Sequence, residues 1–505
     1  MINKAQVQKR FNVIALWFLV VAYLYYLRPL FLVDFWYDEV MSLEEFILVP
    51  FKKTVTDYPV PNNHIFFSLL MNGWLKLWGI HTFAEAVQSI WVVRLLPALF
   101  SAGALYAVAA TVNRVTKQQW GMVGMVALMC MLPFYNYATQ VRGYGLSMLL
   151  IALIANRLVA YYQTRKAMSG VWASVFIALF IYTIPSNLYP VIAFLAVAGT
   201  MCLLIAGRQG FKQAIDSIHA KALLFVESGV VLAIVFYLPV FKQVISNDYV
   251  KSAGMFRAEI WNEALQIVRY LLKPYYISLI LILWGLWIAV AKKADMRVVA
   301  VLAVVIALPF VFSYLRGDKP FDRVFLWICP LLAIVTGVFY TYLHEGFIKR
   351  SMMATSFDFV VMVGLLFGLQ DAKRSAEARL AVDLKNEVNR CDIYYNNLLT
   401  TYHTNQNLGW FKQNYYTDSA VVYLHEVDKY AMHGYLPLHT IQWEPDPQKI
   451  KSVDRYFIIT LAPTKAQNYY LQFDSNYTFK RLNPDLDYVN IIEAVRVTDQ
   501  LTQSF

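Results

Sequence analysis

The sequence predicts an α-helical membrane protein that crosses the bilayer many times and carries a polar C-terminal domain. Composition is the first observation behind this fold class. Hydrophobic residues make up 59% of the 505 residues and charged residues only 15%, whereas a soluble domain has about a quarter of its residues charged. Run length is the second: stretches such as residues 298–315 approach the roughly 20 apolar residues that cross a hydrocarbon core.

The apolar runs predict about eleven transmembrane helices, because lipid offers no hydrogen-bond partner to an open strand. The expected spans are residues 11–33, 91–112, 121–139, 143–162, 171–185, 187–206, 221–240, 275–291, 298–315, 324–343 and 351–370. The basic residues lie in short clusters between these runs. The net charge of +11 therefore reports membrane topology and not a nucleic-acid-binding surface.

The positive-inside rule orients these spans. Lys4, Lys9 and Arg10 place the N-terminus in the cytoplasm, and the basic clusters of the later short loops then also fall inside. A crossing at residues 65–80 would reverse every later loop, so we expect an interfacial helix there. The prediction is a multi-pass protein of the cell (inner or plasma) membrane with a cytoplasmic N-terminus.

Two polar regions are expected on the outer face. One is the first outer loop at residues 34–90, which belongs to a membrane domain at residues 1–370, and the other is a C-terminal domain at residues 371–505. The strand-like runs of the C-terminal domain are residues 420–424, 455–461 and 489–492. Turns with Gly, Pro and Asn and helix-compatible stretches separate the runs, which predicts a small extracytoplasmic α/β domain.

Two adjacent carboxylates, Asp38 and Glu39, follow the first span directly. Neighbouring residues on a helix point about 100° apart, so the two side chains cannot do the same job. One is suited to take a proton from an acceptor, and the other to bind a metal ion, the acceptor or a cationic side chain. The alternative is an interfacial charge that ends the first span.

Three further motifs accompany this acidic pair. They are Pro61-Asn62-Asn63-His64 before the apolar run at 65–80, Gln140-Val141-Arg142-Gly143-Tyr144 at the start of the fourth span, and Phe321-Asp322-Arg323 before a late span. The set resembles the GT-C glycosyltransferases, specifically the protein O-mannosyltransferase and lipid A aminoarabinose transferase branch. The resemblance covers residues 10–345 and not the C-terminal domain. It departs from the family after Arg323, where Val324-Phe325 replaces an immediate aromatic residue.

The resemblance implies an inverting glycosyltransferase that moves a sugar from a polyprenyl-phosphate donor to a hydroxyl group on the outer face of the membrane. It implies Asp38 as the catalytic base and Glu39 as its partner. The donor is already activated, so the enzyme must deprotonate the acceptor and stabilise charge on the leaving phosphate. The expected partners are this donor, a glycan, lipid or protein acceptor, and membrane lipids, without nucleic acid.

The remaining candidates lie near the outer ends of spans. Arg142 and Arg323 are suited to bidentate phosphate binding, and Tyr144 and Lys319 join them as candidates for the donor phosphate. Snorkelling anchors are the alternative for the cations. The candidates for the substrate pocket are Tyr37, Asn63, His64 and Tyr189. Asp38, Glu39 and His64 are candidate ligands of a divalent metal ion, but nothing in the sequence fixes three ligands, so metal dependence stays open.

Two other classes of function fit parts of the sequence. A polytopic transporter or a lipid-linked-sugar flippase would also have many spans, but transporters usually carry paired repeats and broken helices near the midplane. The sequence has no visible repeat, and its polar motifs gather at one face. A sensor or scaffold would use the spans as an anchor only, which requires neither about eleven of them nor an acidic pair in a long first loop.

Overall fold

The computed structural model describes most of the membrane region and the sheet of the C-terminal region. The described residues are 17, 20–31, 35, 37–118, 120–246, 257–272, 276–293, 296–316, 322–347, 361, 363–364, 410–417, 420–425, 441–442, 447–460, 463–482 and 490–497. The chain divides into two compact units. The larger contains Met1–Leu32, Glu45–His81 and Trp91–Ala376, and the smaller contains Val33–Glu44, Thr82–Ile90 and Glu377–Phe505.

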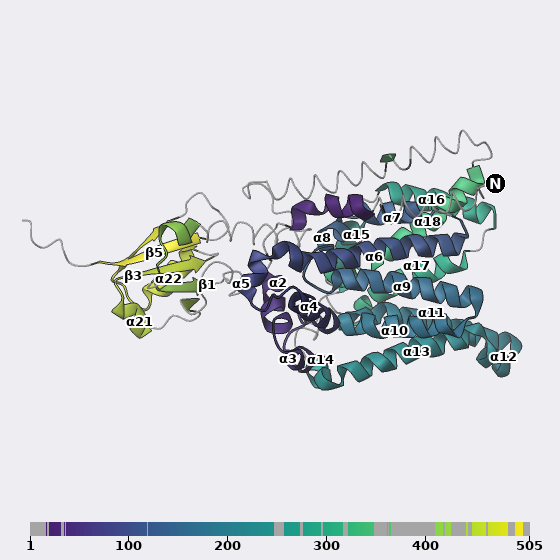
Figure 1. Ribbon diagram of the computed structural model, residues 1–505, viewed down its shortest axis with the longest axis horizontal. Helices are drawn as coiled ribbons and strands as arrows, with labels where there is room; N and C mark the ends of the chain where they lie inside the picture. The colour runs from purple at the N-terminus through teal and green to yellow at the C-terminus, as the bar shows by residue number, and fades with distance from the viewer. Residues whose placement is uncertain are drawn as a thin grey trace, which may run out of the picture. The chain divides into compact units, whose positions relative to one another are not determined.

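Long apolar helices build the larger unit (Figure 1). Among the described residues, six helical segments are long and apolar enough to cross a membrane: Ile90–Thr116, Tyr144–Thr164, Pro185–Gln209, Ile218–Ile245, Arg297–Leu315 and Ile328–Glu345. Three shorter apolar helices are Ile65–Leu77, Ala167–Thr183 and Leu279–Ala291. This confirms a multi-pass membrane protein. The count of eleven stays a prediction, since residues 351–370 lie almost wholly outside the described chain.

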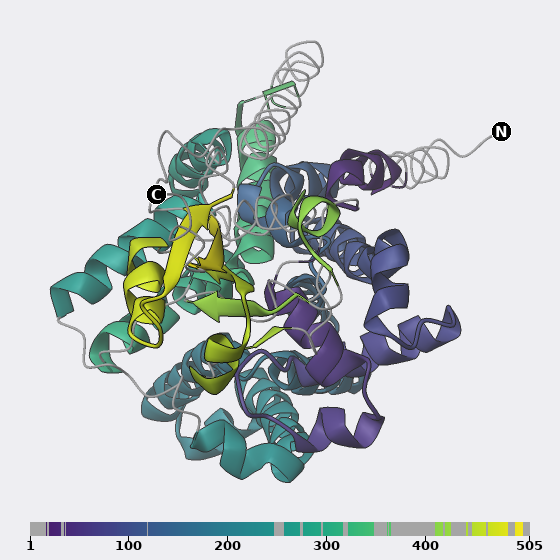
Figure 2. The same ribbon diagram turned by 90° about the vertical axis from the view of Figure 1, so that its left-hand side faces the viewer.

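The elements of the larger unit follow in chain order. They are η1 (Arg28–Phe31), α3 (Phe51–Thr56), α4 (Ile65–Leu77), α6 (Ile90–Thr116), α7 (Gly121–Met129), α8 (Leu132–Tyr137), α9 (Tyr144–Thr164), α10 (Ala167–Thr183), η3 (Pro185–Asn187), α11 (Leu188–Gln209), α12 (Phe211–Asp216), α13 (Ile218–Tyr237), η4 (Leu238–Val240), α14 (Phe241–Ile245), α15 (Arg257–Leu271), α16 (Tyr276–Ala291), α17 (Arg297–Arg316), η6 (Asp322–Phe325) and α18 (Ile328–Phe347). Helices α9, α10 and α13 run side by side in Figure 1, and Figure 2 views this unit from one end.

One expected span is broken. The sequence predicts a continuous helix over residues 121–139, but α7 ends at Met129 and α8 begins at Leu132. Between them Met131 is extended, with φ −76° and ψ 118°. Pro133 explains the break, because its ring clashes with the carbonyl of residue 129 in a continuous helix and it has no N–H to donate. Helix α15 is a second departure, since its amphipathic sequence was not predicted to form an element.

Small residues let the helices of the larger unit approach closely. A Cβ placed on Gly337 of α18 would lie 2.8 Å from a methyl of Val112 and 3.3 Å from Cα of Gly124 on α7. Such contacts are typical of membrane helices, where packing and not hydrophobicity drives association. The close approach packs α18 directly against α6 and α7.

The smaller unit contains a five-stranded sheet. Its elements are α2 (Tyr37–Ser42), α5 (Phe83–Gln88), β1 (Val422–His425), β2 (Ile441–Gln442), α21 (Pro447–Ser452), β3 (Arg455–Thr460), α22 (Pro463–Leu471), β4 (Tyr477–Arg481) and β5 (Asn490–Arg496), and η2 (Leu43–Ile47) follows α2 in the chain. The strand order is β2-β1-β3-β5-β4. Strand β1 pairs in parallel with β2 and β3, and β5 pairs antiparallel with β3 and β4. The predicted α/β class is thus confirmed, and β1, β3 and β5 overlap the three predicted strand runs.

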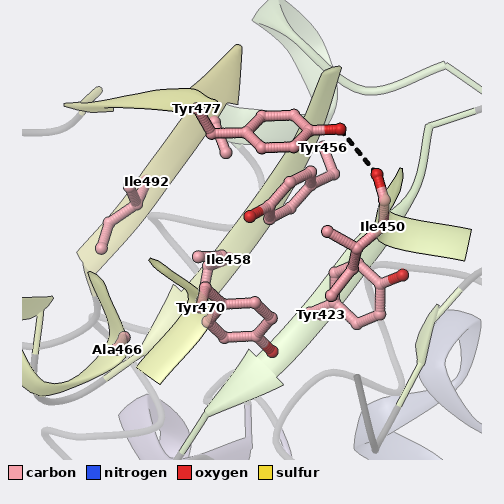
Figure 3. Close-up of a cluster of buried hydrophobic side chains, with 9 residues drawn as sticks. Tyr423, Ile450, Tyr456, Ile458, Ala466, Tyr470, Tyr477 and Ile492 are labelled. Atoms are coloured by element: carbon pink, nitrogen blue, oxygen red, sulfur yellow. Dashed lines mark hydrogen bonds between the residues drawn. The ribbon is translucent and has the colours of Figure 1, made fainter. Parts of the chain in front are cut away.

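Both faces of this sheet are covered by side chains. Alternation along the strands sends odd and even positions to opposite faces. Phe457 and Ile459 of β3 join a cluster on one face with Phe411. Tyr456 and Ile458 join a tyrosine-rich cluster on the other face, where Tyr470 of α22 packs (Figure 3). The hydroxyl of Tyr477 donates to the carbonyl of Ile450 at 2.6 Å, which ties β4 to α21 (Figure 3).

Candidate functional site

A buried histidine is held at the start of helix α4. His64 is the residue before the first helical position of α4 and is only 3% exposed. Its imidazole does not cap the helix. Instead, the backbone N–H of Gly143 donates to Nδ1 of His64 at 2.8 Å. A neutral imidazole that accepts at Nδ1 carries its proton on Nε2, so this contact fixes His64 as a donor at Nε2.

The surroundings keep His64 neutral. Burial lowers its pKa well below the usual value, and the positive charges of Arg142 and then Arg323 lower it further. These effects act in one direction, because both a low dielectric and a nearby cation disfavour the imidazolium. The charges of Arg142 and Arg323 therefore act on one buried site, although the two arginines are far apart in the sequence.

The guanidinium of Arg142 lies within the same group of side chains. Arg142 is 3% exposed and donates to Oδ1 of Asn62. Its Cζ lies 5.0 Å from the ring centre of Tyr144, a cation–π contact. The ring of Tyr144 in turn meets the ring of His64 edge-on, with 5.1 Å between centroids. We call His64, Arg142, Tyr144 and Asn62 the His64–Arg142 cluster.

Asn63 stabilises the loop that carries His64. Its Nδ2 donates to the carbonyls of Thr54 at 2.9 Å and Asp57 at 2.8 Å, and its Oδ1 accepts from the hydroxyl of Ser68 at 3.2 Å. Asn63 is fully buried. Both ends of the carboxamide are thus used to hold the loop that presents His64, which fits a positioning role better than direct contact with a substrate.

The turn between α8 and α9 is anchored to α6. Arg94 donates through Nη1 to the carbonyl of Thr139 at 3.2 Å, and Ser101 donates to the carbonyl of Ala138 at 3.0 Å. The turn continues with a bond from the N–H of Arg142 to the carbonyl of Gln140 at 2.7 Å. Pinning this turn places Gly143 and Arg142 against the loop from α3 to α4.

Gln140 is a residue that sequence reasoning missed as a candidate. Its side chain is 1% exposed, and neither Oε1 nor Nε2 has a hydrogen-bond partner in the part of the chain that the structure describes. A buried unsatisfied amide costs about 1–3 kcal/mol, so native proteins seldom keep one without a reason. The sequence signal was its place two residues before Arg142 in the motif.

Asp38 and Glu39 belong to the smaller unit. Both lie in the first turn of α2, where the helix dipole favours negative charge. Asp38 is 7% exposed and Glu39 is 1% exposed, so both carboxylates are buried. The hydroxyl of Ser42 donates to the backbone carbonyl of Asp38 at 2.8 Å, one turn along the same helix. Tyr37 begins α2, but its side chain lies outside the described part of the chain.

The comparisons with known proteins decide the fold. The sequence matches no protein-family profile and no curated protein sequence. Its structure superposes on ArnT from Cupriavidus metallidurans in the apo state with a TM-score of 0.55 and 12% identity, over 97% of this chain and 98% of that chain. The chain has the GT-C fold. ArnT from the same organism bound to undecaprenyl phosphate superposes with a TM-score of 0.53 and 12% identity, over 95% of this chain and 97% of that one.

Within the larger unit, the structure brings part of the sequence-predicted residues together. His64, Arg142 and Tyr144 lie together, and the charge of Arg323 acts on the same imidazole. Tyr189 lies half-buried on α11, after a turn where Asn187 donates to the hydroxyl of Ser147 on α9 at 2.9 Å. Lys319 lies outside the described residues.

The metal candidates belong to two units, Asp38 and Glu39 to the smaller and His64 to the larger. Within the described residues, no group of three or more His, Cys, Asp or Glu side chains is placed to hold a metal ion. The hydrogen bond from Gly143 to Nδ1 also bears on whether His64 can bind a metal ion. A metal ion at Nε2 would require the proton to sit on Nδ1, where it would face the N–H of Gly143. His64 as placed here is a hydrogen-bond donor at Nε2, and the metal role of Asp38, Glu39 and His64 stays a prediction.

Proposed function

We propose that this protein is an inverting glycosyltransferase that moves a sugar from a polyprenyl-phosphate donor to a hydroxyl of a glycan, lipid or protein acceptor. The observation that carries the proposal is the His64–Arg142 cluster, where two guanidinium charges act on one buried, neutral histidine. A phosphate is the natural ligand of such a site, because guanidinium groups bind its oxygens in bidentate geometry. The GT-C fold supports the same class of reaction.

The residues have distinct roles in this proposal. Arg142 and Arg323 bind the donor phosphate and stabilise the charge that it gains as it leaves. Tyr144 holds the guanidinium of Arg142 in place through its ring face. The Nε2–H of His64 donates to an oxygen of the donor, either on the phosphate or on the sugar.

Asp38 is the general base of the proposed reaction. It takes the proton of the acceptor hydroxyl as the acceptor oxygen attacks C1 of the sugar. The bond between C1 and the phosphate oxygen breaks in the same step, so the anomeric centre inverts and polyprenyl phosphate leaves. Burial of Asp38 and Glu39 supports a chemical role, since a buried carboxylate is costly to keep. Glu39 points elsewhere on the same turn and acts as the partner of Asp38.

The proposed site lies at the outer face of the cell membrane, with the N-terminus in the cytoplasm and the C-terminal domain outside. The positive-inside pattern of the loops supports this orientation. Tyr37 and Tyr189 are proposed to line the sugar pocket, and Lys319 to assist the phosphate. The membrane part, residues 1–370, would carry the chemistry, and residues 371–505 would help to select the acceptor.

One experiment tests transfer and separates it from transport. The purified protein in lipid nanodiscs is incubated with a panel of polyprenyl-phosphate pentoses and hexoses and with a crude envelope extract as acceptor source. We expect mass spectrometry to detect free polyprenyl phosphate and a new glycosidic product with one donor. A flippase would move the same lipid across vesicle membranes without breaking the sugar–phosphate bond, and that result would overturn the proposal.

A further inference from the structure

A row of polar side chains crosses the sheet of the smaller unit at one end. His425 of β1 pairs with Thr460 of β3, and Thr460 pairs with Asn490 of β5. Residues in register on neighbouring strands point to the same face, so the three side chains form one line. His425 and Thr460 are in direct contact, with 3.2 Å between Nδ1 and Oγ1.

This polar row ends the tyrosine-rich face of the sheet. The next row inward on that face is Tyr423, Ile458 and Ile492, which are fully buried (Figure 3). The face therefore changes from apolar to polar at its last row. That row lies at the carboxyl ends of the parallel strands β1 and β3, which is the edge where open α/β sheets usually bind ligands.

Asn490 provides an independent sign of a ligand. It is 4% exposed, and its Nδ2 lies 3.5 Å from the carbonyl of Thr460. Its Oδ1 is buried and has no hydrogen-bond partner within the described residues. Buried acceptors of this kind are rare in native proteins, because each loses its bonds to water without replacement. Within the described residues, the carboxamide oxygen of Asn490 therefore lacks a donor, which a ligand could supply.

An aromatic ring stands beside the polar row. The centroid of Tyr469 on α22 lies 5.6 Å from the His425 ring and 5.2 Å from the ring of Phe473. Phe473 meets it edge-on, at 85° between planes, which steadies the Tyr469 ring. Tyr469 is 39% exposed. A steadied, accessible ring next to uncharged hydrogen-bonding groups offers an apolar surface and polar contacts at once.

We propose that His425, Thr460, Asn490 and Tyr469 form a binding site for a neutral saccharide. None of the four side chains carries a fixed charge, which disfavours a phosphate or a carboxylate as the ligand. A sugar has hydroxyl donors for Oδ1 of Asn490 and an apolar face for the ring of Tyr469. Binding at this site needs neither donor nor turnover, so it can be tested independently of the transfer reaction.

The binding test uses the full-length protein in nanodiscs with fluorescently labelled neutral oligosaccharides, such as maltotriose, cellotriose and mannotriose. We expect at least one of them to bind saturably in the absence of any lipid donor. Tyr469→Ala should weaken this binding by about tenfold, as expected for loss of an aromatic anchor. Leu471→Ala is the matched control, because Leu471 lies on the same helix and is also 39% exposed. It should bind as the wild type does.

Two further variants complete the test. Asn490→Leu removes the buried acceptor and should abolish binding, while a circular-dichroism melt reports whether the sheet is intact. If that variant fails to fold, Tyr469→Ala still decides the matter. Asp38→Asn should bind the oligosaccharide normally, which separates this site from the transfer chemistry. No binding of any neutral oligosaccharide, or equal binding by Tyr469→Ala and Leu471→Ala, would overturn the proposal and leave Asn490 as a water-binding residue.

Discussion

The N–H of Gly143 donates to Nδ1 of His64 across 79 positions of sequence, at 2.8 Å. The bond joins the turn before α9 to the loop before α4. It fixes which ring nitrogen of His64 carries the proton, and it does so with a backbone N–H, which only proline at position 143 would remove. Gly143 therefore sets both the position and the tautomer of the histidine.

Gly143→Ala should damage this arrangement by steric contact. The new Cβ would lie 2.7 Å from Cγ2 of Thr183 and 3.1 Å from Nδ1 of His64. The φ of Gly143 is −68°, so alanine is allowed by the backbone and only the contacts matter. Overpacking of this kind costs about 1–3 kcal/mol, which a thermal melt in detergent or nanodiscs would detect.

Thr183→Ser gives this prediction a rescue. It removes Cγ2 and keeps the hydroxyl, which donates to the carbonyl of Leu179 at 2.7 Å. The double variant should recover part of the lost stability, the remainder being the contact with His64. Gly73→Ala is the control, because a Cβ there meets nothing within 4 Å. A Gly143→Ala protein as stable as Gly73→Ala would show that the site is looser than described.

The stability of the protein should fall at mildly acidic pH through His64. Burial, Arg142 and Arg323 lower the folded-state pKa of His64, whereas the unfolded chain has a histidine pKa of about 6.5. Below that value the unfolded state binds the proton more readily than the folded state. The contribution of neutral His64 is therefore complete above about pH 6.5 and is lost as pH falls, by at most about 1.4 kcal/mol per pH unit.

His64→Gln isolates this effect. The carboxamide oxygen of glutamine can accept from Gly143, but the side chain does not titrate. We expect the difference in melting temperature between pH 7.5 and pH 5 to be smaller in His64→Gln than in the wild type. An identical difference in the two proteins would mean that the titration of His64 does not affect folding.

Arg142→Ala and Arg323→Ala should weaken donor binding, because we place the donor phosphate between their guanidinium groups. Truncation of a buried charged partner usually lowers affinity by about 30-fold or more. Arg142→Lys should recover only part of it, since an ammonium lacks the forked geometry. The measurement is binding of undecaprenyl phosphate to protein in nanodiscs. Lys53→Ala, at a half-exposed residue paired with Glu45 at 3.1 Å, should not change it. Unchanged binding in both arginine variants would return these residues to membrane anchoring.

Asp38→Asn should abolish transfer and leave donor binding intact. The substitution keeps the shape of the side chain and removes only the proton acceptor, so turnover should fall by about 10² to 10⁴-fold. Glu39→Gln should reduce turnover less, because the two side chains of α2 point in different directions. Wild-type turnover in Asp38→Asn would rule out the assignment of Asp38 as the base.

Gln140→Leu should separate stability from function. Leucine fills a similar volume without burying an unsatisfied amide, so the variant should melt at the same or a higher temperature than the wild type. Transfer should fall if the amide binds the donor or the acceptor, because the substrate then loses its partner. A variant that melts higher with full activity would make Gln140 a structural residue only.

The hydropathy of the sequence determined the architecture. The transfer of an apolar run from water into lipid depends only on the residues of that run. The helices α6, α9 and α13 therefore lie where the apolar runs predict them. The strands β1 and β3 fall on short apolar runs in the same way. The break before α8 could also have been predicted from the sequence, because Pro133 lies within the expected span. The span was predicted as continuous because of the length of its apolar run.

Contacts between distant segments were decided only by the tertiary structure. The motifs placed His64 and Arg142 among the candidates, but no periodicity can state that Gly143 donates to Nδ1 of His64, because that depends on how α4, α9 and their loops pack. The register that aligns His425, Thr460 and Asn490 is likewise a property of paired strands and not of any one of them. Whether a segment lies in lipid or in water can be predicted from the hydropathy of its own residues. Which groups form a hydrogen bond depends on how distant segments pack in the folded unit.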